Sequence, residues 1–88
     1  MEDFTFSDNK ADSRFELKRA GAVAAHANYK LQDGAVLLTH TEVLPGNEGQ
    51  GIGSKLAKFV LDDLRGRGAT IVPQCEFIAS YIARHPAG

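Results

Sequence analysis

Several residue types are scarce in this sequence. It has one cysteine, Cys75, one methionine, three prolines and no tryptophan in 88 residues. A single cysteine excludes a disulfide within the chain. No apolar stretch is long enough to span a bilayer, and the start, Met1-Glu2-Asp3, is acidic where a secretory signal would be basic. We therefore expect a cytoplasmic protein that has no membrane partner.

The sequence also lacks an excess of charge of either sign. Ten basic residues stand against eleven acidic ones, which leaves a formal net charge of −1, and the longest basic run is the pair Lys18-Arg19. This balance argues against nucleic acid as a partner, because nucleic-acid-binding proteins present a basic surface to the phosphates. At 88 residues the chain has room for one domain, with one layer of helix packed on one sheet.

The N-terminal residues show no sustained hydrophobic period. Residues 1–12 are polar apart from a few apolar positions such as Phe4 and Phe6. Without a period of 2 or 3.6 residues, the pattern favours neither a strand nor a helix. We therefore expect a loosely ordered N-terminal arm over residues 1–12 and a single domain over residues 13–88.

The next segment has the alternation that is typical of strands. Polar and apolar side chains alternate over residues 14–18 and again over residues 23–31. Asp33-Gly34 follows as a strong hairpin turn signal, and residues 35–43 are rich in β-formers. Together these segments predict an antiparallel meander of three strands.

The second half of the chain alternates helix and strand patterns. Residues 52–67 predict a helix whose apolar face would cover the sheet. That face consists of Ile52, Leu56, Phe59, Val60 and Leu64. A short apolar run, 69–72, lies before Pro73, and a right-handed crossover would place it parallel to the third strand. A last helix is expected over residues 76–84. The predicted fold class is therefore α+β: a meander, a helix, a parallel fourth strand and a C-terminal helix.

A glycine-rich segment, Gly49-Gln50-Gly51-Ile52-Gly53-Ser54, joins the third strand to the first helix. Glycines let the backbone approach a ligand closely, and the first turn of a helix presents unpaired N–H groups to an anion. The segment therefore indicates either a site for a phosphorylated cofactor or a tight turn with no ligand. Lys55, on the first helical turn, would either reach a phosphate or lie in solvent.

Motifs along most of the chain resemble one family. They are a tyrosine-containing strand, a His-Thr-x-Val strand end, the glycine-rich loop, a Pro-x-Cys-x-Phe segment and a Tyr-Ile-x-Arg-His-Pro tail. From residue 13 onward, the chain resembles the small single-domain branch of the Gcn5-related N-acetyltransferase (GNAT) superfamily. The resemblance implies a GNAT-like fold that binds acetyl-coenzyme A. The matching residues are Tyr29, His40-Thr41-Glu42-Val43, Gly49 to Gly53, Pro73-Gln74-Cys75-Glu76-Phe77 and Tyr81 to Pro86.

The resemblance also implies how coenzyme A is held. Strands three and four would splay apart, so that the backbone of Thr41, Glu42 and Val43 can bond to the pantetheine arm. One departure from the family pattern is Glu48, which stands where the loop motif usually has Gln or Arg. The pyrophosphate would bind the backbone amides of Gly49, Gln50, Gly51, Ile52, Gly53 and Ser54.

Three residues are candidates for the chemistry. Cys75 begins the last predicted helix, where the helix N-terminus favours a thiolate, and the resemblance implies that it faces the acetyl group. It would accept the acetyl group or protonate the leaving thiolate, unless it is only a small packing residue. His40 could relay a proton and Glu42, on the same strand face, could act as a base. The alternative for His40 is a hydrogen-bonded packing role.

The acceptor and the assembly state stay open at this stage. We expect an acetyltransferase that acts on an amine or a thiol, with a weakly catalytic coenzyme A-binding module as the alternative. No metal site is expected. His26, Asn28 and Lys30 share one strand face, and we expect that face to lie in solvent rather than to bind the acceptor. An exposed edge strand would allow a weak homodimer, and otherwise the protein is a monomer.

Overall fold

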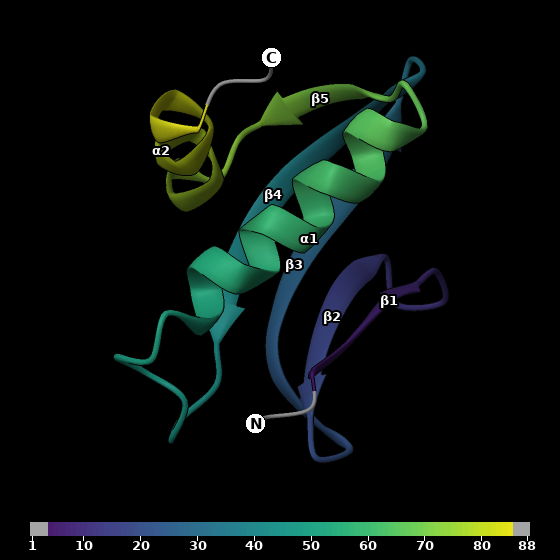
Figure 1. The fold of residues 1–88 in the computed structure, drawn as a ribbon. Helices are drawn as coiled ribbons and strands as arrows, with labels where there is room; N and C mark the ends of the chain where they lie inside the picture. The colour runs from purple at the N-terminus through teal and green to yellow at the C-terminus, as the bar shows by residue number, and fades with distance from the viewer. Residues whose placement is uncertain (1–3, 86–88) are drawn as a thin grey trace.

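The structure is a computed structural model that describes residues 4–85 and contains one sheet and two helices (Figure 1). The sheet has five strands in the order β1-β2-β3-β4-β5. Its first four strands are antiparallel neighbours, and β5 runs parallel to β4. These features confirm the predicted α+β class. The elements are β1 Phe4–Asn9, β2 Arg14–Arg19, β3 Ala22–Gln32, β4 Ala35–Val43, α1 Ile52–Gly66, β5 Thr70–Pro73 and α2 Glu76–Arg84.

The strand β1 lies where the sequence predicted a loosely ordered arm. Phe4–Asn9 pairs with β2 along its whole length, so the prediction is wrong for these residues, while residues 1–3 of the arm lie outside the described range. The ring of Phe6 stacks on Phe15 and on Phe59, with centroid distances of 5.6 and 5.4 Å. Pairing with β2 and the rings of Phe15 and Phe59 stabilise β1, although the hydrophobic pattern of this segment is too weak to predict a strand.

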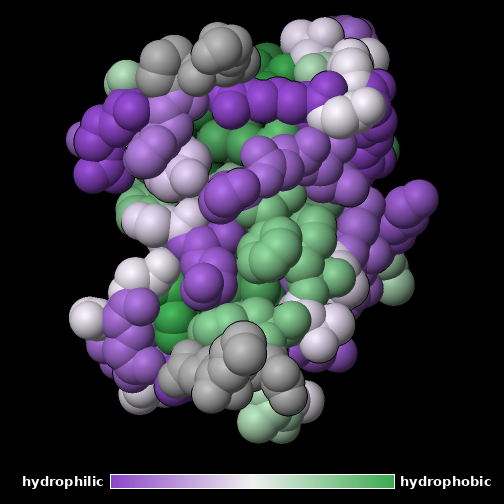
Figure 2. Space-filling model, viewed as in Figure 1, coloured by the Kyte–Doolittle hydropathy of each residue, from purple (hydrophilic) through white to green (hydrophobic). Residues whose placement is uncertain are grey.

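The core forms where α1 packs across one face of the sheet (Figure 1). Leu56, Val60 and Leu64 of α1 are fully buried there, and Ile78 of α2 joins the same cluster. Phe59 was expected on this face, yet it is 39% exposed and covers Phe6. Figure 2 shows apolar residues gathered in the middle of the helix-bearing face with polar residues around them. The sheet's share of the core is Phe15, Leu17, Ala24, Ala25, Ala27, Tyr29, Val36 and Leu38.

The neighbours of β4 change halfway along the strand. β5 pairs with β4 only as far as Leu38, which lies opposite Pro73. The register with β3 slips at the same point, and this slip leaves Thr39 as the extra residue of a bulge. Pro73 has no N–H to continue the ladder, so β5 ends and the chain turns into α2. The rest of β4, residues 39–43, is paired with β3 alone within the described chain, as the predicted splay requires.

Neither helix in the described part of the chain has the length and apolarity that crossing a membrane requires.

Replacing Phe6 with alanine tests whether β1 belongs to the folded domain. We expect Phe6→Ala to lower the free energy of unfolding by about 1–3 kcal/mol, because it removes a ring that is stacked on both sides. Urea titration followed by circular dichroism measures this change. Thr5→Ala is the matched control, since Thr5 is on the same strand and is exposed. Equal stability of the two variants would contradict a structural role for β1.

Candidate functional site

The first turn of α1 has free hydrogen-bond donors. Gly51 is the N-cap residue, with φ 72° in the left-handed region, which glycine adopts without strain. No side chain caps this helix end in the described structure, and the first turn holds no acidic residue. Lys55 is the first residue whose amide bonds within the helix, to the carbonyl of Gly51 at 3.0 Å. The amides of Ile52, Gly53 and Ser54 are therefore available to an anion at the positive end of the helix dipole.

The side chains of the loop are tied to the protein. The carboxylate of Glu48 accepts a hydrogen bond from the Gly46 amide at 2.8 Å. Gln50 accepts one from Nη1 of Arg19, also at 2.8 Å, and donates to the Gly46 carbonyl at 3.4 Å. Glu48 thus satisfies a backbone donor of its own loop, although it departs from the family pattern.

Two cations lie close to the loop and to β1. The ammonium of Lys55 is 5.2 Å from the centroid of the Phe4 ring, and the guanidinium carbon of Arg19 is 5.9 Å from the same centroid. Both contacts have the geometry of cation–π interactions. They place positive charge at the end of the molecule where the helix amides are free, while a contact between Lys55 and a phosphate stays a prediction.

A hollow of about 290 Å³ runs along this end of α1. Gly53 lines this hollow, and a Cβ atom there would meet Cζ of Phe77 at 3.0 Å and Cγ2 of Val43 at 3.3 Å. Glycine at this position lets α1, α2 and β4 come together. This hollow, hereafter the groove, is therefore polar at the helix amides and apolar at the side chains of Phe77 and Val43. It is lined by Val43, Asn47, Glu48, Gly49, Gly51, Ile52, Gly53, Ser54 and Phe77.

Cys75 is the N-cap residue of α2 and lies against β4. Its thiol donates to the hydroxyl oxygen of Thr41 across 3.4 Å, and its amide donates to the Leu38 carbonyl at 2.8 Å. Burial acts to raise the pKa of the Cys75 thiol, but hydrogen bonds from the Thr41 hydroxyl and from the backbone of Ile78 and Phe77 stabilise the thiolate, so the pKa is lowered overall. The structure thus brings Cys75 and Thr41 together.

His40 and Glu42 lie on the other face of β4. They flank Thr41, whose side chain is directed to Cys75, and side chains alternate between the faces of a strand. The Nε2 atom of His40 is 3.6 Å from Oε1 of Glu42, and the two side chains are 62% and 49% exposed. The three predicted catalytic residues are therefore divided between the two faces of one strand.

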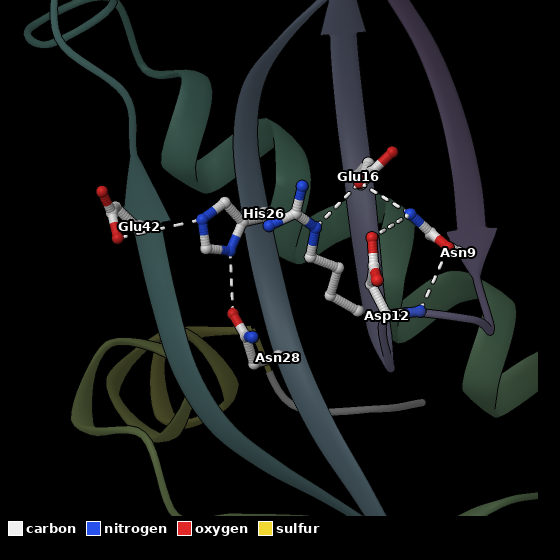
Figure 3. Close-up of polar contacts among 7 residues, drawn as sticks. Asn9, Asp12, Glu16, His26, Asn28 and Glu42 are labelled. Carbon is white, nitrogen blue, oxygen red and sulfur yellow. Dashed lines mark hydrogen bonds and ion pairs between the residues drawn. The ribbon is translucent and has the colours of Figure 1, made fainter.

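His26 lies on the sheet face opposite α1, but its side chain is nearly buried there instead of being exposed to solvent as predicted. It is only 9% exposed, and its Nδ1 is 2.8 Å from Oδ1 of Asn28. Its Nε2 is 3.8 Å from Oε1 of Glu42, the residue opposite on β4 (Figure 3). Asn28 is half-buried, and Lys30 alone of the three is exposed. Only the pairing of β3 with β4 reveals this neighbour of Glu42.

A buried carboxylate lies next to His26 on the same face of the sheet, on the neighbouring strand β2. Glu16, opposite His26 on β2, is 6% exposed in its side chain and accepts hydrogen bonds from Asn9 at 3.1 Å and from Nε of Arg14 at 2.8 Å (Figure 3). The hydrogen bonds from Asn9 and Arg14 outweigh burial and hold the pKa of Glu16 below its ordinary value. The positive charge of Arg14 is thereby paired with the carboxylate of Glu16.

Tyr29, the strand tyrosine of the family pattern, lies at a different cavity. Its hydroxyl donates to Asp8 at 2.6 Å beside a hollow of about 220 Å³ that Phe15, Leu31 and Arg67 also line. Burial, together with the hydrogen bond to the Asp8 carboxylate, raises the pKa of Tyr29 to about 12. Tyr29 is not among the residues that line the groove beside Phe77.

Comparison with known proteins identifies the family of this chain. A family model described as GCN5-related N-acetyl-transferase matches residues 14–87. The matched range begins at β2 and includes the glycine-rich loop and Cys75, together with His26, His40 and Glu42. The strand β1 lies outside it. No curated protein matches the chain.

Adding a methyl group at Gly53 tests the close approach of the three elements. In an open helical position such as Gly66, Gly→Ala stabilises a protein by about 0.4–1 kcal/mol. We expect Gly66→Ala to show that gain and Gly53→Ala to lose it, because the new Cβ crowds Phe77 and Val43. Thermal unfolding measures both, and NMR shifts of Phe77 should change in Gly53→Ala alone. Equal stabilisation by the two substitutions would contradict the packing described.

The lowered pKa of Cys75 can be measured by alkylation. Only the thiolate reacts with iodoacetamide, so the rate should reach half its maximum at a lower pH than for free cysteine. Thr41→Val removes a hydrogen bond to the thiolate and should move that midpoint to higher pH. Thr39→Val is the control, since the Thr39 hydroxyl donates to the Asn28 carbonyl instead. A midpoint that Thr41→Val leaves in place would rule out this hydrogen bond as a cause.

Proposed function

Because the chain belongs to the GCN5-related N-acetyltransferase family, we propose that it transfers an acetyl group from acetyl-coenzyme A to an amine or thiol acceptor. The match supports acetyl transfer in general. One observation of this chain supports the cofactor in particular: the free amides of α1 lie in a groove that is also lined by Val43, the last residue of the free edge of β4.

The residues present fit coenzyme A in chemistry as well as in position. Its pyrophosphate requires several donors, and the amides of Gly51 to Ser54 would supply them together with the positive end of α1. The amides of its pantetheine arm require an unpaired strand edge, which residues 39–43 of β4 would offer. Arg19 and Lys55 add positive charge next to the loop.

Cys75 and Thr41 would act at the thioester end. Acetyl-coenzyme A supplies an acetyl group that is activated as a thioester. The lowered pKa of Cys75 raises its thiolate fraction, and this favours acceptance of the acetyl group by Sγ over a purely structural role. In that step a bond from Sγ to the acetyl carbon forms, the thioester bond breaks, and coenzyme A leaves with the electron pair. The acceptor then takes the acetyl group and returns the Cys75 thiolate.

His40 and Glu42 would serve the acceptor. Both are accessible from the face of β4 opposite Cys75. An amine must lose a proton to become a nucleophile, and a carboxylate beside an imidazole can take it. This assignment places the carboxylate and the thiolate on separate faces of β4, where the two negative charges do not repel each other at close range.

A charge placed at the helix N-terminus tests cofactor binding without unfolding the protein. Ser54→Glu puts a carboxylate at the third helical residue, where it bonds the free amides and favours the helix. We expect coenzyme A to bind this variant at least about tenfold more weakly by isothermal titration calorimetry, because the carboxylate competes with the pyrophosphate for the same amides.

The control is Ser80→Glu, which adds the same charge at an exposed serine of α2 and should bind like the unaltered chain. Equal affinity of both variants, or no binding by the unaltered chain, would refute the cofactor site. With binding established, mass spectrometry after incubation with acetyl-coenzyme A should find the acetyl group on Cys75, and Cys75→Ala should lose it. Binding without transfer to Cys75 or to any acceptor would identify a binding module instead.

A further inference from the structure

The hollow of about 220 Å³ beside Tyr29, hereafter the distal hollow, lies at the C-terminal end of α1. Leu64 and Arg67 line it there, whereas the groove is lined by residues 51–54 at the N-terminal end of the same helix. An α-helix rises about 1.5 Å per residue, so Ser54 and Leu64 are about 15 Å apart along its axis. The two spaces share no lining residue. The distal hollow is therefore separate from the groove of the proposed function.

Much of the lining of the distal hollow is apolar. Phe15, Val36 and Leu64 contribute to it, and no more than 8% of each is exposed. Leu31 lines it too and is 73% exposed, more than any other large apolar residue in the described part of the chain. A cavity of about 150 Å³ with apolar walls binds benzene, so the distal hollow has room for one aromatic ring. A ring placed there would also cover the side chain of Leu31, which water otherwise surrounds.

Asp8 supplies the negative charge of the distal hollow, and the protein already pairs it. Its Oδ1 accepts a hydrogen bond from the Tyr29 hydroxyl at 2.6 Å, and its Oδ2 is 3.7 Å from Nη2 of Arg67. The Nε and Nη2 atoms of Arg67 also donate to Asp63, a residue outside the hollow. Tyr29 and Arg67 thus stabilise the Asp8 carboxylate, and a ligand need not supply a cation for it.

The donors of the distal hollow are less fully used than its acceptors. The ammonium of Lys10, the hydroxyl of Ser13 and Nη1 of Arg67 make no hydrogen bond or ion pair within residues 4–85. Lys10 is therefore a cation of the hollow that no carboxylate in this range offsets. An anion that accepts several hydrogen bonds complements such a set of donors, and a carboxylate accepts at both of its oxygens.

We propose that the distal hollow binds a small carboxylate with an aromatic or branched aliphatic body. The body would lie against the apolar walls and cover Leu31, and the carboxylate would accept hydrogen bonds from Lys10 and its neighbouring donors. Burial of the apolar body supplies the affinity, while the charged group fixes its orientation. An inorganic anion would leave the apolar walls in water, and an alkylammonium would meet Lys10 with a like charge. This inference goes beyond the proposed function, because it concerns other residues and another ligand.

A titration of the full chain with 3-phenylpropanoate tests the proposal. Backbone amide signals are followed by NMR, and we expect saturable shifts at Lys10, Ser13, Leu31 and Arg67, with the amides of residues 51–54 unchanged. Two analogues separate the parts of the ligand: 3-phenyl-1-propanol keeps the ring without the charge, and propanoate keeps the charge without the ring. Each should bind at least about fivefold more weakly than 3-phenylpropanoate.

Two exposed positions assign the response to the distal hollow without unfolding the protein. Lys10→Gln removes the cation and should weaken 3-phenylpropanoate binding at least about fivefold. Lys30→Gln is its matched control, because Lys30 is an exposed lysine of β3 that does not line the hollow. Leu31→Ala removes apolar contact and should also weaken binding. Its control is Val72→Ala, at an exposed apolar residue of β5 outside the hollow.

Several results would overturn the inference. The absence of saturable shifts would mean that the hollow holds only water, and equal affinity for 3-phenyl-1-propanol would mean that no anion site exists. Tighter binding of 3-phenylpropylammonium would make Asp8 the group that recognises the ligand. Binding that Lys10→Gln and Leu31→Ala both leave unchanged would place the ligand elsewhere. The titration contains no acetyl-coenzyme A, so its failure leaves the proposed function intact, and failure of acetyl transfer leaves the distal hollow intact.

Discussion

β4 has a hydrogen-bonded neighbour on each side only as far as Leu38. Beyond that residue β5 has ended at Pro73, and the Cys75 amide makes the last bond to β4. Pro73 has no N–H to donate to β4, and after the bond from Cys75 the chain turns into α2 and leaves the sheet. The free edge over residues 39–43, the apolar groove and the thiol at the start of α2 all follow from this separation.

The residues that could take part in the reaction lie on both faces of β4. Thr41 and Cys75 lie on the helix-bearing side, where hydrogen bonds and the α2 amides stabilise a thiolate. His26 and Glu42 lie on the open side, where an acceptor would approach. A carboxylate next to the thiol would disfavour the thiolate by repulsion, and the alternation of side chains along β4 places Glu42 and Cys75 on opposite faces of the strand.

The edge of the sheet supports the glycine-rich loop. Arg19 at the end of β2 holds Gln50, and its side chain lies with Lys55 against the ring of Phe4. β1 therefore contributes to the cofactor end of the molecule although it lies outside the range that the family model matches. Phe6 anchors this strand between two other rings, so the stability of β1 and the position of the loop are coupled through β2.

Local sequence determined the type of most elements and both helix N-termini, because periodicity, glycines and Pro73 act on their immediate neighbours. It placed the glycine-rich loop before α1 and Cys75 before α2, which is why these parts of the candidate site could be predicted. Tertiary contacts decided the rest: β1 is held by its pairing with β2 and by the stacking of Phe6 on Phe59, and His26 meets Glu42 only in the register of β3 with β4. Register depends on the bulge at Thr39, and no periodic pattern predicts a bulge.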